Sequence, residues 1–125
     1  MAEALFAHES YKIVGVLFDV YNELGFGYQE KYYYRAIKNK LINNGFKIKE
    51  QLYVPLVADG KHIGSYYLDF LVNDCIVLEI KVANAVYPKH VKQVHGYLKA
   101  NKLQLGIIGV FTKDGIIQKR VVNLY

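Results

Sequence analysis

The chain has one cysteine, no tryptophan and two prolines among its 125 residues. Because Cys75 stands alone, an intrachain disulfide and a zinc site built from several cysteines are both excluded within this sequence. Long apolar runs are also missing, and the longest, around Ile107–Phe111, is far shorter than the roughly 20 residues that cross a bilayer. The first residues lack the basic start and apolar stretch of a secretory leader. We therefore expect a soluble, cytoplasmic protein without a membrane partner.

The composition indicates a folded chain with a modest basic surplus. Apolar residues make up 53% and charged residues 22% of the sequence, which excludes global disorder. The length suits one compact domain over residues 1–125, with no linker or repeat. Sixteen Lys and Arg against eleven Asp and Glu give a net charge of +5, which is compatible with a polyanionic partner without requiring one.

The first half of the chain begins with two amphipathic segments. Between Ser10 and Leu24 apolar side chains recur every three or four residues, which predicts a helix. Gly25 follows it directly and is well placed for a left-handed cap. A second helix is expected from about Gln29 to Asn43, with Tyr33 or Tyr34 facing the core.

Beyond Gly45 the apolar period changes from 3.6 to 2, which predicts strands. A half-buried strand is expected over residues 46–56, followed by a hairpin turn at Asp59-Gly60. Further strands are expected over 63–72, 75–82, 103–111 and 116–122, with a helix that starts near Pro88. The nearly all-apolar segment 103–111 is typical of a central strand covered on both faces. The order ααβββαββ predicts an α/β fold, with a single mixed sheet flanked by helices.

Three charged residues lie inside the apolar strands. Asp69 interrupts the segment 66–72, and Glu79 and Lys81 interrupt the segment 76–82. Strand residues two apart share a face, so Glu79 and Lys81 project together, away from their apolar neighbours. Two adjacent carboxylates repel each other unless a divalent cation or a shared proton lies between them. A nearby lysine suits the binding of an attacking water or a phosphate oxygen.

The length of the loop between the two strands decides whether Asp69 joins Glu79. A two-residue loop at Asn73-Asp74 would set Asp69 opposite Leu78, whereas a three-residue loop that includes Cys75 sets it opposite Glu79. We predict the three-residue loop or an equivalent bulge. Taken alone, this charge pattern is weak evidence, since a solvated strand face with a cross-strand charge pair would also produce it.

Four motifs in order give the chain a resemblance to a known family. Gly27-x-x-Glu30-x-x-Tyr33, then Asp69, then Glu79-x-Lys81, then the segment Gln93–Lys99 resemble the GxxExxY family of small prokaryotic proteins, within the PD-(D/E)XK nuclease superfamily. The resemblance runs from about residue 11 to residue 122. It implies a restriction-endonuclease-like domain that hydrolyses phosphodiester bonds with Mg²⁺ or Mn²⁺.

The resemblance also implies roles for individual residues. Asp69 and Glu79 would be the main metal ligands, together with the backbone carbonyl of Ile80, and Glu30 would reach the ion directly or through water. Lys81 would orient the attacking water and stabilise the charge that develops on the phosphate. Gln93 would complete the catalytic set by positioning the water or the scissile strand. For Glu30 the simpler alternative is an acid favoured by the helix dipole.

Basic and aromatic side chains near these motifs are candidates for nucleic-acid binding. They are Lys31, Arg35, Lys89, Lys92 and Tyr97. The alternatives are solvated helix faces for the lysines, a nearby carboxylate partner for Arg35 and a packing role for Tyr97.

We therefore expect a nuclease that acts on a nucleic acid, in the first instance DNA. Two alternatives stay open: a binding module that keeps the fold without cleaving, and an oligomeric structural protein with a tyrosine-rich interface. A homodimer is compatible with the nuclease hypothesis, because one domain of this size seldom acts on both strands of a duplex.

Overall fold

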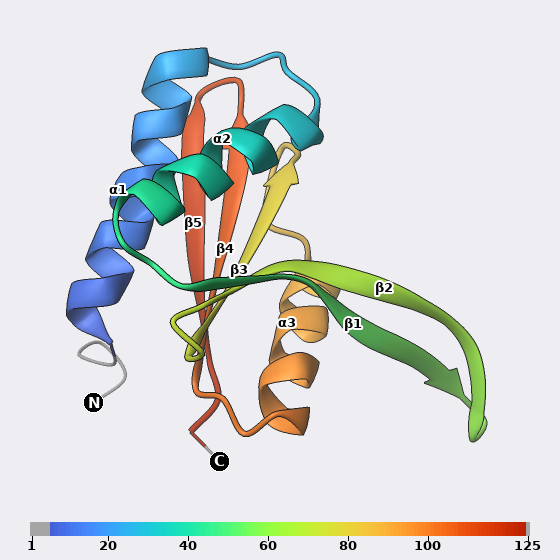
Figure 1. Ribbon diagram of the computed structural model, residues 1–125. Helices are drawn as coiled ribbons and strands as arrows, with labels where there is room; N and C mark the ends of the chain where they lie inside the picture. Colours follow the sequence, from blue (N-terminus) through green and yellow to red (C-terminus); the bar gives the residue numbers. More distant parts are fainter. Residues whose placement is uncertain (1–5, 125) are drawn as a thin grey trace.

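The structure of the protein is a computed structural model that describes residues 6–124 (Figure 1). Residues 1–5, on which the expected lack of a secretory leader largely rests, lie outside the described residues. The described part contains, in order, α1 (Ala7–Leu24), α2 (Glu30–Asn43), β1 (Ile48–Ala58), β2 (Lys61–Val72), β3 (Ile76–Val82), α3 (Pro88–Ala100), β4 (Leu105–Thr112) and β5 (Gly115–Val122). The predicted order ααβββαββ is confirmed.

The five strands form one mixed sheet. Their spatial order is β1-β2-β3-β4-β5, and β3 and β4 run parallel while the other neighbours are antiparallel. The parallel pair needs a crossover, which α3 provides. The α/β class with a single mixed sheet is therefore confirmed.

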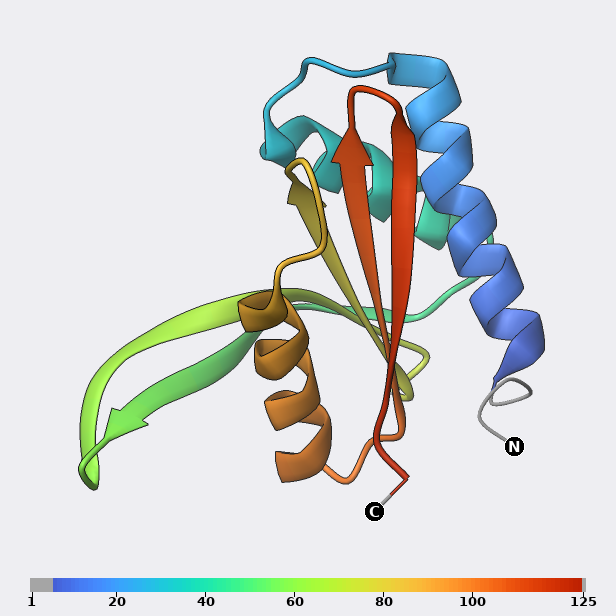
Figure 2. The same cartoon turned by 180° about the vertical axis from the view of Figure 1, so that it is seen from behind.

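Helices cover both faces of the sheet. Buried residues of α1 and α2, such as Ile13, Leu17 and Tyr33, share one hydrophobic cluster with Ile107 of β4. Val94 of α3 belongs to a second cluster, together with Ile108 of β4. Since consecutive strand residues point to opposite faces, α1 and α2 lie on one side of the sheet and α3 on the other (Figures 1 and 2).

The central strand β4 is buried along its whole length, as its apolar sequence predicts. Two of its glycines allow helices to approach closely. A Cβ atom at Gly106 would collide with Val94 of α3, and one at Gly109 would lie 2.7 Å from Cδ1 of Leu17 in α1. Because neither glycine has a side chain, α1 and α3 can both lie close to the sheet.

Gly25 ends α1 as expected, although the cap geometry differs from the prediction. Its N–H donates to the carbonyl of Tyr21 at 2.7 Å, and its φ is 72°. Its ψ of −170° places it outside the left-handed helical region, so the predicted left-handed cap is wrong. The chain leaves the helix extended at this glycine and runs toward α2.

The β1–β2 hairpin extends well beyond the core (Figures 1 and 2). Its turn is the predicted Asp59-Gly60, with φ of 53° and 70°, the positive values that a type I′ turn requires. The expectation of a half-buried first strand is wrong for its distal half. Leu52 is the buried side chain of β1, whereas Leu56 is 41% exposed. The hairpin bends away from the sheet, so its far end has no second layer to pack against.

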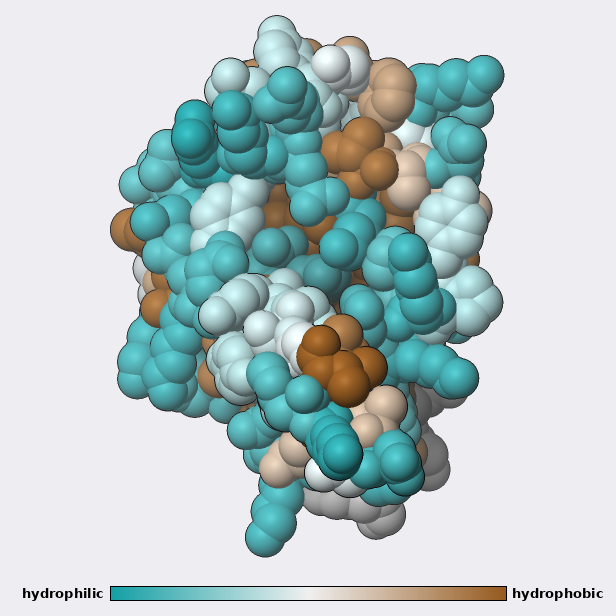
Figure 3. Space-filling model, turned by 90° about the vertical axis from the view of Figure 1, so that its right-hand side faces the viewer, coloured by the Kyte–Doolittle hydropathy of each residue, from teal (hydrophilic) through white to brown (hydrophobic). Residues whose placement is uncertain are grey.

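The side toward which the hairpin projects carries mostly hydrophilic side chains, with small hydrophobic patches between them (Figure 3). Within residues 6–124, no helix has both the length and the apolar character needed to cross a membrane.

Candidate active site

The register between β2 and β3 brings the two strand carboxylates together. Val72 pairs with Ile76 across the three-residue loop 73–75, as predicted, and the ladder continues to Phe70 opposite Leu78. One step further along this register, Asp69 lies opposite Glu79. The sequence-based choice of the longer loop is therefore confirmed.

Glu79 and Lys81 project from the same face of β3. Their β4 partners in the parallel pairing are Ile108 and Val110, which belong to the cluster on the α3 side of the sheet. Ile80, between them, packs in the opposite cluster with α1 and α2. The predicted shared face is confirmed, and the structure shows that it is the face on the α3 side of the sheet.

Two reciprocal hydrogen bonds join the carboxylates to the strands. The backbone N–H of Asp69 donates to Oε1 of Glu79 at 2.9 Å, and the N–H of Ile80 donates to Oδ2 of Asp69 at 2.8 Å. Each carboxylate thus accepts a backbone donor from the facing strand, beyond the last backbone pair of β2 and β3. These bonds fix both side chains where the two strands begin to separate.

Burial makes this pair electrostatically demanding. Glu79 is only 2% exposed, and Asp69 is half-buried beside it. Burial, reinforced by the Glu79 charge, raises the pKa of Asp69 to about 8. Nζ of Lys81 lies 3.3 Å from Oε2 of Glu79 and supplies one positive charge. Without a cation, Asp69 therefore tends to hold a proton near neutral pH; when both carboxylates are ionised, one lysine leaves an excess negative charge that an added cation would offset.

Glu30 lies at the edge of this cluster, at the start of α2. Its Oε1 accepts the backbone N–H of Val82 at 3.2 Å, which ties α2 to the end of β3. Partial loss of hydration raises the pKa of Glu30, Lys81 lowers it, and Asp69 raises it further. Glu30 therefore shares an electrostatic environment with the strand residues.

The loop that leads to Glu30 is anchored by Tyr33. This side chain is fully buried, its ring centroid lies 4.3 Å from that of Phe111, and its hydroxyl donates to the carbonyl of Gly25 at 2.6 Å. The tyrosine of the first motif thus holds the loop through Gly25, and this loop leads to the glutamate of the motif.

The donor set fits a hard divalent cation. Within the described residues 6–124, no three His, Cys, Asp or Glu side chains are gathered closely enough to form a ready-made metal cluster. Mg²⁺, however, usually binds through one or two carboxylates and keeps several waters. Asp69 and Glu79, which the two reciprocal hydrogen bonds hold side by side, offer hard oxygen donors of this kind.

Gln93 and Tyr97 lie on α3, and Tyr66 connects this helix to the site. The Tyr66 hydroxyl donates a long hydrogen bond of 3.5 Å to the carbonyl of Gln93. Burial raises the pKa of Tyr66, and the Glu79 charge raises it further. Tyr97 packs against the α3-side cluster, in line with its alternative role in packing. The role of the Gln93 side chain stays a prediction.

The predicted basic residues fall into two groups. Lys31 and Arg35 flank the Tyr32 ring at 5.2 and 5.6 Å, and they line a cleft of about 480 Å³ together with Glu30. Arg35 thus lies over an aromatic ring, and within residues 6–124 it forms no salt bridge with the carboxylate partner considered as its alternative. The lysines of α3 lie elsewhere: Lys89 lines a hollow with Tyr87, Pro88 and His90, and Lys92 lines one with Val86, Pro88, Val91 and Lys119.

Three further residues near the site have no signal in the sequence pattern. The Tyr34 hydroxyl donates to Oε1 of Glu50 at 2.6 Å and accepts from Nε2 of Gln51 at 3.2 Å. Gln51, opposite Asp69 in the register, has a φ of 54°. The third residue is His90. Burial lowers its pKa, and the positive charge of Lys81 lowers it further. Each contact joins elements that are distant in sequence, which periodicity alone does not reveal.

Comparison with known proteins gives a family and a fold. The sequence profile of the PD-(D/E)XK nuclease superfamily matches residues 7–122. The crystal structure of SSO0001 is similar with a TM-score of 0.56 and 19% identity, over 74% of this chain and 50% of that one. An alkaline exonuclease (LHK-Exo) from Laribacter hongkongensis is similar with a TM-score of 0.50 and 18% identity, over 74% of this chain and 54% of that one.

This chain thus spans about half the length of either structure, and at these identities the likeness concerns the fold. No curated protein matches the sequence.

Proposed function

Because the chain belongs to the PD-(D/E)XK nuclease superfamily, we propose that it is a Mg²⁺- or Mn²⁺-dependent nuclease of the GxxExxY type. Its reaction is the hydrolysis of phosphodiester bonds, in DNA, by in-line attack of water. The observation that carries this proposal is the reciprocal bonding of Asp69 and Glu79, with Lys81 at 3.3 Å from Glu79. A sheet gains no packing from a buried and a half-buried acid side by side, so their presence favours a role in catalysis.

Each residue of the set has a distinct task. Asp69, Glu79 and the carbonyl of Ile80 hold the cation, with Glu30 as a further ligand, directly or through water. When bound, the divalent cation supplies charge stabilisation on the phosphate and lowers the pKa of a coordinated water. Lys81 donates hydrogen bonds to the water or to a phosphate oxygen and offsets the negative charge that develops there.

The helices at the rim bind the nucleic acid. Lys31 and Arg35 line the cleft next to Glu30, where they contact backbone phosphates of the substrate. Gln93 positions the attacking water or the scissile strand from α3, and Lys89 and Lys92 extend the basic surface of that helix. Such phosphate contacts make binding weaker as salt concentration rises.

The test is a cleavage assay on a panel of DNA and RNA substrates, each with Mg²⁺ or Mn²⁺ and with EDTA as the metal-free control. Glu79→Gln keeps the shape of the side chain and removes its charge, so it should abolish cleavage. Asp59→Asn is the matched control, because it removes a carboxylate at the tip of the hairpin, where asparagine also suits the positive φ. Its cleavage rate should equal that of the unmodified protein.

Cleavage that is lost with EDTA and with Glu79→Gln supports the proposal, and the preferred substrate then defines the subclass. Absence of cleavage on every substrate, with nucleic-acid binding that metal does not alter, contradicts it and favours a non-cleaving binding module. Association of the chain into a homodimer is a separate question.

A further inference from the structure

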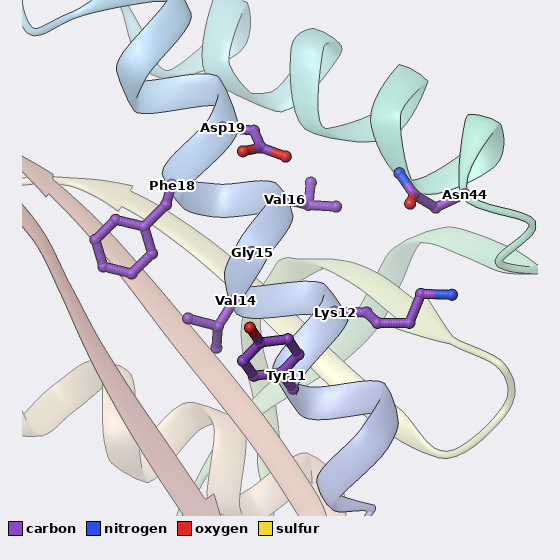
Figure 4. Close-up of a pocket in the computed structure, with 8 residues that line it drawn as sticks. All are labelled: Tyr11, Lys12, Val14, Gly15, Val16, Phe18, Asp19 and Asn44. Atoms are coloured by element: carbon purple, nitrogen blue, oxygen red, sulfur yellow. The ribbon is translucent and has the colours of Figure 1, made fainter.

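The outer face of α1 carries apolar side chains that the fold leaves exposed. Tyr11 is 81% exposed and Phe18 is 43% exposed, although the opposite face of the helix is buried against the sheet. Between them lie Val14 and Gly15, and a hollow of about 380 Å³ opens over this stretch. Figure 4 shows Tyr11 and Phe18 on either side of Gly15 along the helix.

Gly15 has no function in the packing of its own chain. Glycine is among the least favourable residues inside a helix, so its presence calls for a reason. A Cβ atom at position 15 would meet nothing within 4 Å, which excludes a close neighbour within the described chain. On the outer side of α1, a glycine at this position lets another helix come close, because no side chain stands in between.

A positive and a negative side chain lie on either side of Gly15 along α1. Lys12 precedes Gly15 by nearly one turn, and Asp19 follows it by about one turn. Figure 4 shows both side chains on the same flank of α1, the flank that faces Asn44. Nζ of Lys12 lies 5.6 Å from the centroid of the Phe46 ring, and Asp19 forms no salt bridge within the described residues.

We propose that this face binds a second copy of the chain, with the two α1 helices antiparallel around a two-fold axis at Gly15. Such an axis reverses the order of residues along the helix but keeps each residue on its own flank. It sets Lys12 against the partner's Asp19 on one flank. On the other flank it sets Tyr11 against the partner's Phe18. One surface is therefore complementary to itself, which is the condition for a closed dimer.

Two other arrangements fit this face less well. Parallel helices related by a two-fold axis would set the flank with Lys12 and Asp19 against the aromatic flank of the partner, so neither charge would gain an ion pair. A polyanion would be repelled by the Asp19 carboxylate on one flank of this surface. The catalytic carboxylates belong to α2, β2 and β3, so the dimer leaves both sites open. This inference is independent of the proposed nuclease activity.

The test is sedimentation equilibrium of the full chain and of charge-reversed variants. Asp19→Lys replaces both ion pairs of the symmetric interface with like-charge pairs, so the dimer dissociation constant should rise roughly tenfold or more. The double variant Lys12→Asp/Asp19→Lys restores opposite charges in the reversed sense and should recover an affinity near that of the unmodified chain. Circular dichroism confirms that each variant is folded.

A glycine pair provides the second arm. Gly15→Ala inserts a methyl group at the axis of both copies and should weaken the dimer by a similar factor. Gly96→Ala is the matched control, because Gly96 also lies inside a helix with nothing within 4 Å, but on α3. It should leave the dissociation constant unchanged.

An unmodified chain that sediments as a monomer at the highest attainable concentration would overturn the inference. A dimer that Asp19→Lys does not weaken, or that the double variant does not restore, would equally exclude this surface.

Discussion

Gly106 controls how closely α3 approaches the sheet, and its replacement by alanine probes that spacing. The added Cβ would collide with Cγ1 of Val94, whose side chain is fully buried between α3 and β4. Overpacking of this kind costs about 1–3 kcal/mol. Against it stands a gain of about 0.4–1 kcal/mol from the reduced freedom of the unfolded chain. We therefore expect Gly106→Ala to destabilise the protein by about 1–2 kcal/mol.

Urea unfolding measures this loss, and a double-mutant cycle with Val94→Ala identifies its cause. Val94→Ala removes the obstructing methyl groups and leaves a cavity, which the new methyl at position 106 partly fills. The double variant should therefore be more stable than the sum of the single effects, by about 1 kcal/mol or more. The added methyl group should also push α3 away from the sheet. This shift should lower the proposed cleavage activity, because α3 carries Gln93, whose carbonyl accepts a hydrogen bond from Tyr66 of β2.

Gly96→Ala is the control on the same helix, where a methyl group has open space. It should stabilise the protein by about 0.5–1 kcal/mol, the ordinary difference in helix propensity. Equal stability of Gly106→Ala and the unmodified protein, or strictly additive effects in the cycle, would refute the close-approach argument.

Three other measurements address the site and its surroundings. Mn²⁺ at a roughly hundredfold excess over its Kd should stabilise the folded protein by about 2.7 kcal/mol, measured as a rise in Tm. Glu79→Gln should remove most of this rise in Tm. An equal rise in the variant would place the ion elsewhere. The hydrogen bond from Tyr34 is the main cause of the lowered pKa of Glu50. Its contribution to the free energy of unfolding is therefore present above the pKa of Glu50 in the unfolded chain, and it is lost as pH falls through the pKa of Glu50 in the folded protein. Tyr34→Phe should therefore flatten the acid side of the stability profile from urea unfolding, and an unchanged profile would contradict this. Burial raises the pKa of the Cys75 thiol, so iodoacetamide should alkylate it more slowly at neutral pH than free cysteine, as followed by mass spectrometry; an equal rate would show an accessible thiolate.

Local patterns were sufficient to predict the secondary structure and one decisive contact. The helical stripe of α1 and the run of apolar residues in β4 each specify an element without reference to the rest of the chain. The loop between β2 and β3 is equally local, and its length alone fixes which residue faces Glu79. For this reason the Asp69–Glu79 pairing could be predicted from sequence.

Other features depend on the path of the chain in space. The alternation of β1 continues through Leu56, yet this side chain is exposed because the hairpin curves away from both helical layers. His90 approaches the site, and Tyr66 bonds to the carbonyl of Gln93, only because α3 crosses beside the sheet, a contact between elements that no short window contains. Sequence periodicity reports which side of a strand is apolar, but not whether anything covers it.

The pairing of β2 with β3 ends at Phe70, while β2 stays paired with β1, and this divides the sheet into regions of unequal local stability. Amides of β4 are enclosed on both sides, so they should exchange with deuterium only through global unfolding. Amides near the Asp59-Gly60 turn lie in a two-stranded ribbon with exposed side chains, and they should exchange through local opening at much lower free energy. Asp69 lies at the boundary, with its N–H bonded to the slow side through Glu79. The proposed metal ligand Asp69 thus marks the point where slow exchange should give way to fast exchange along a single strand.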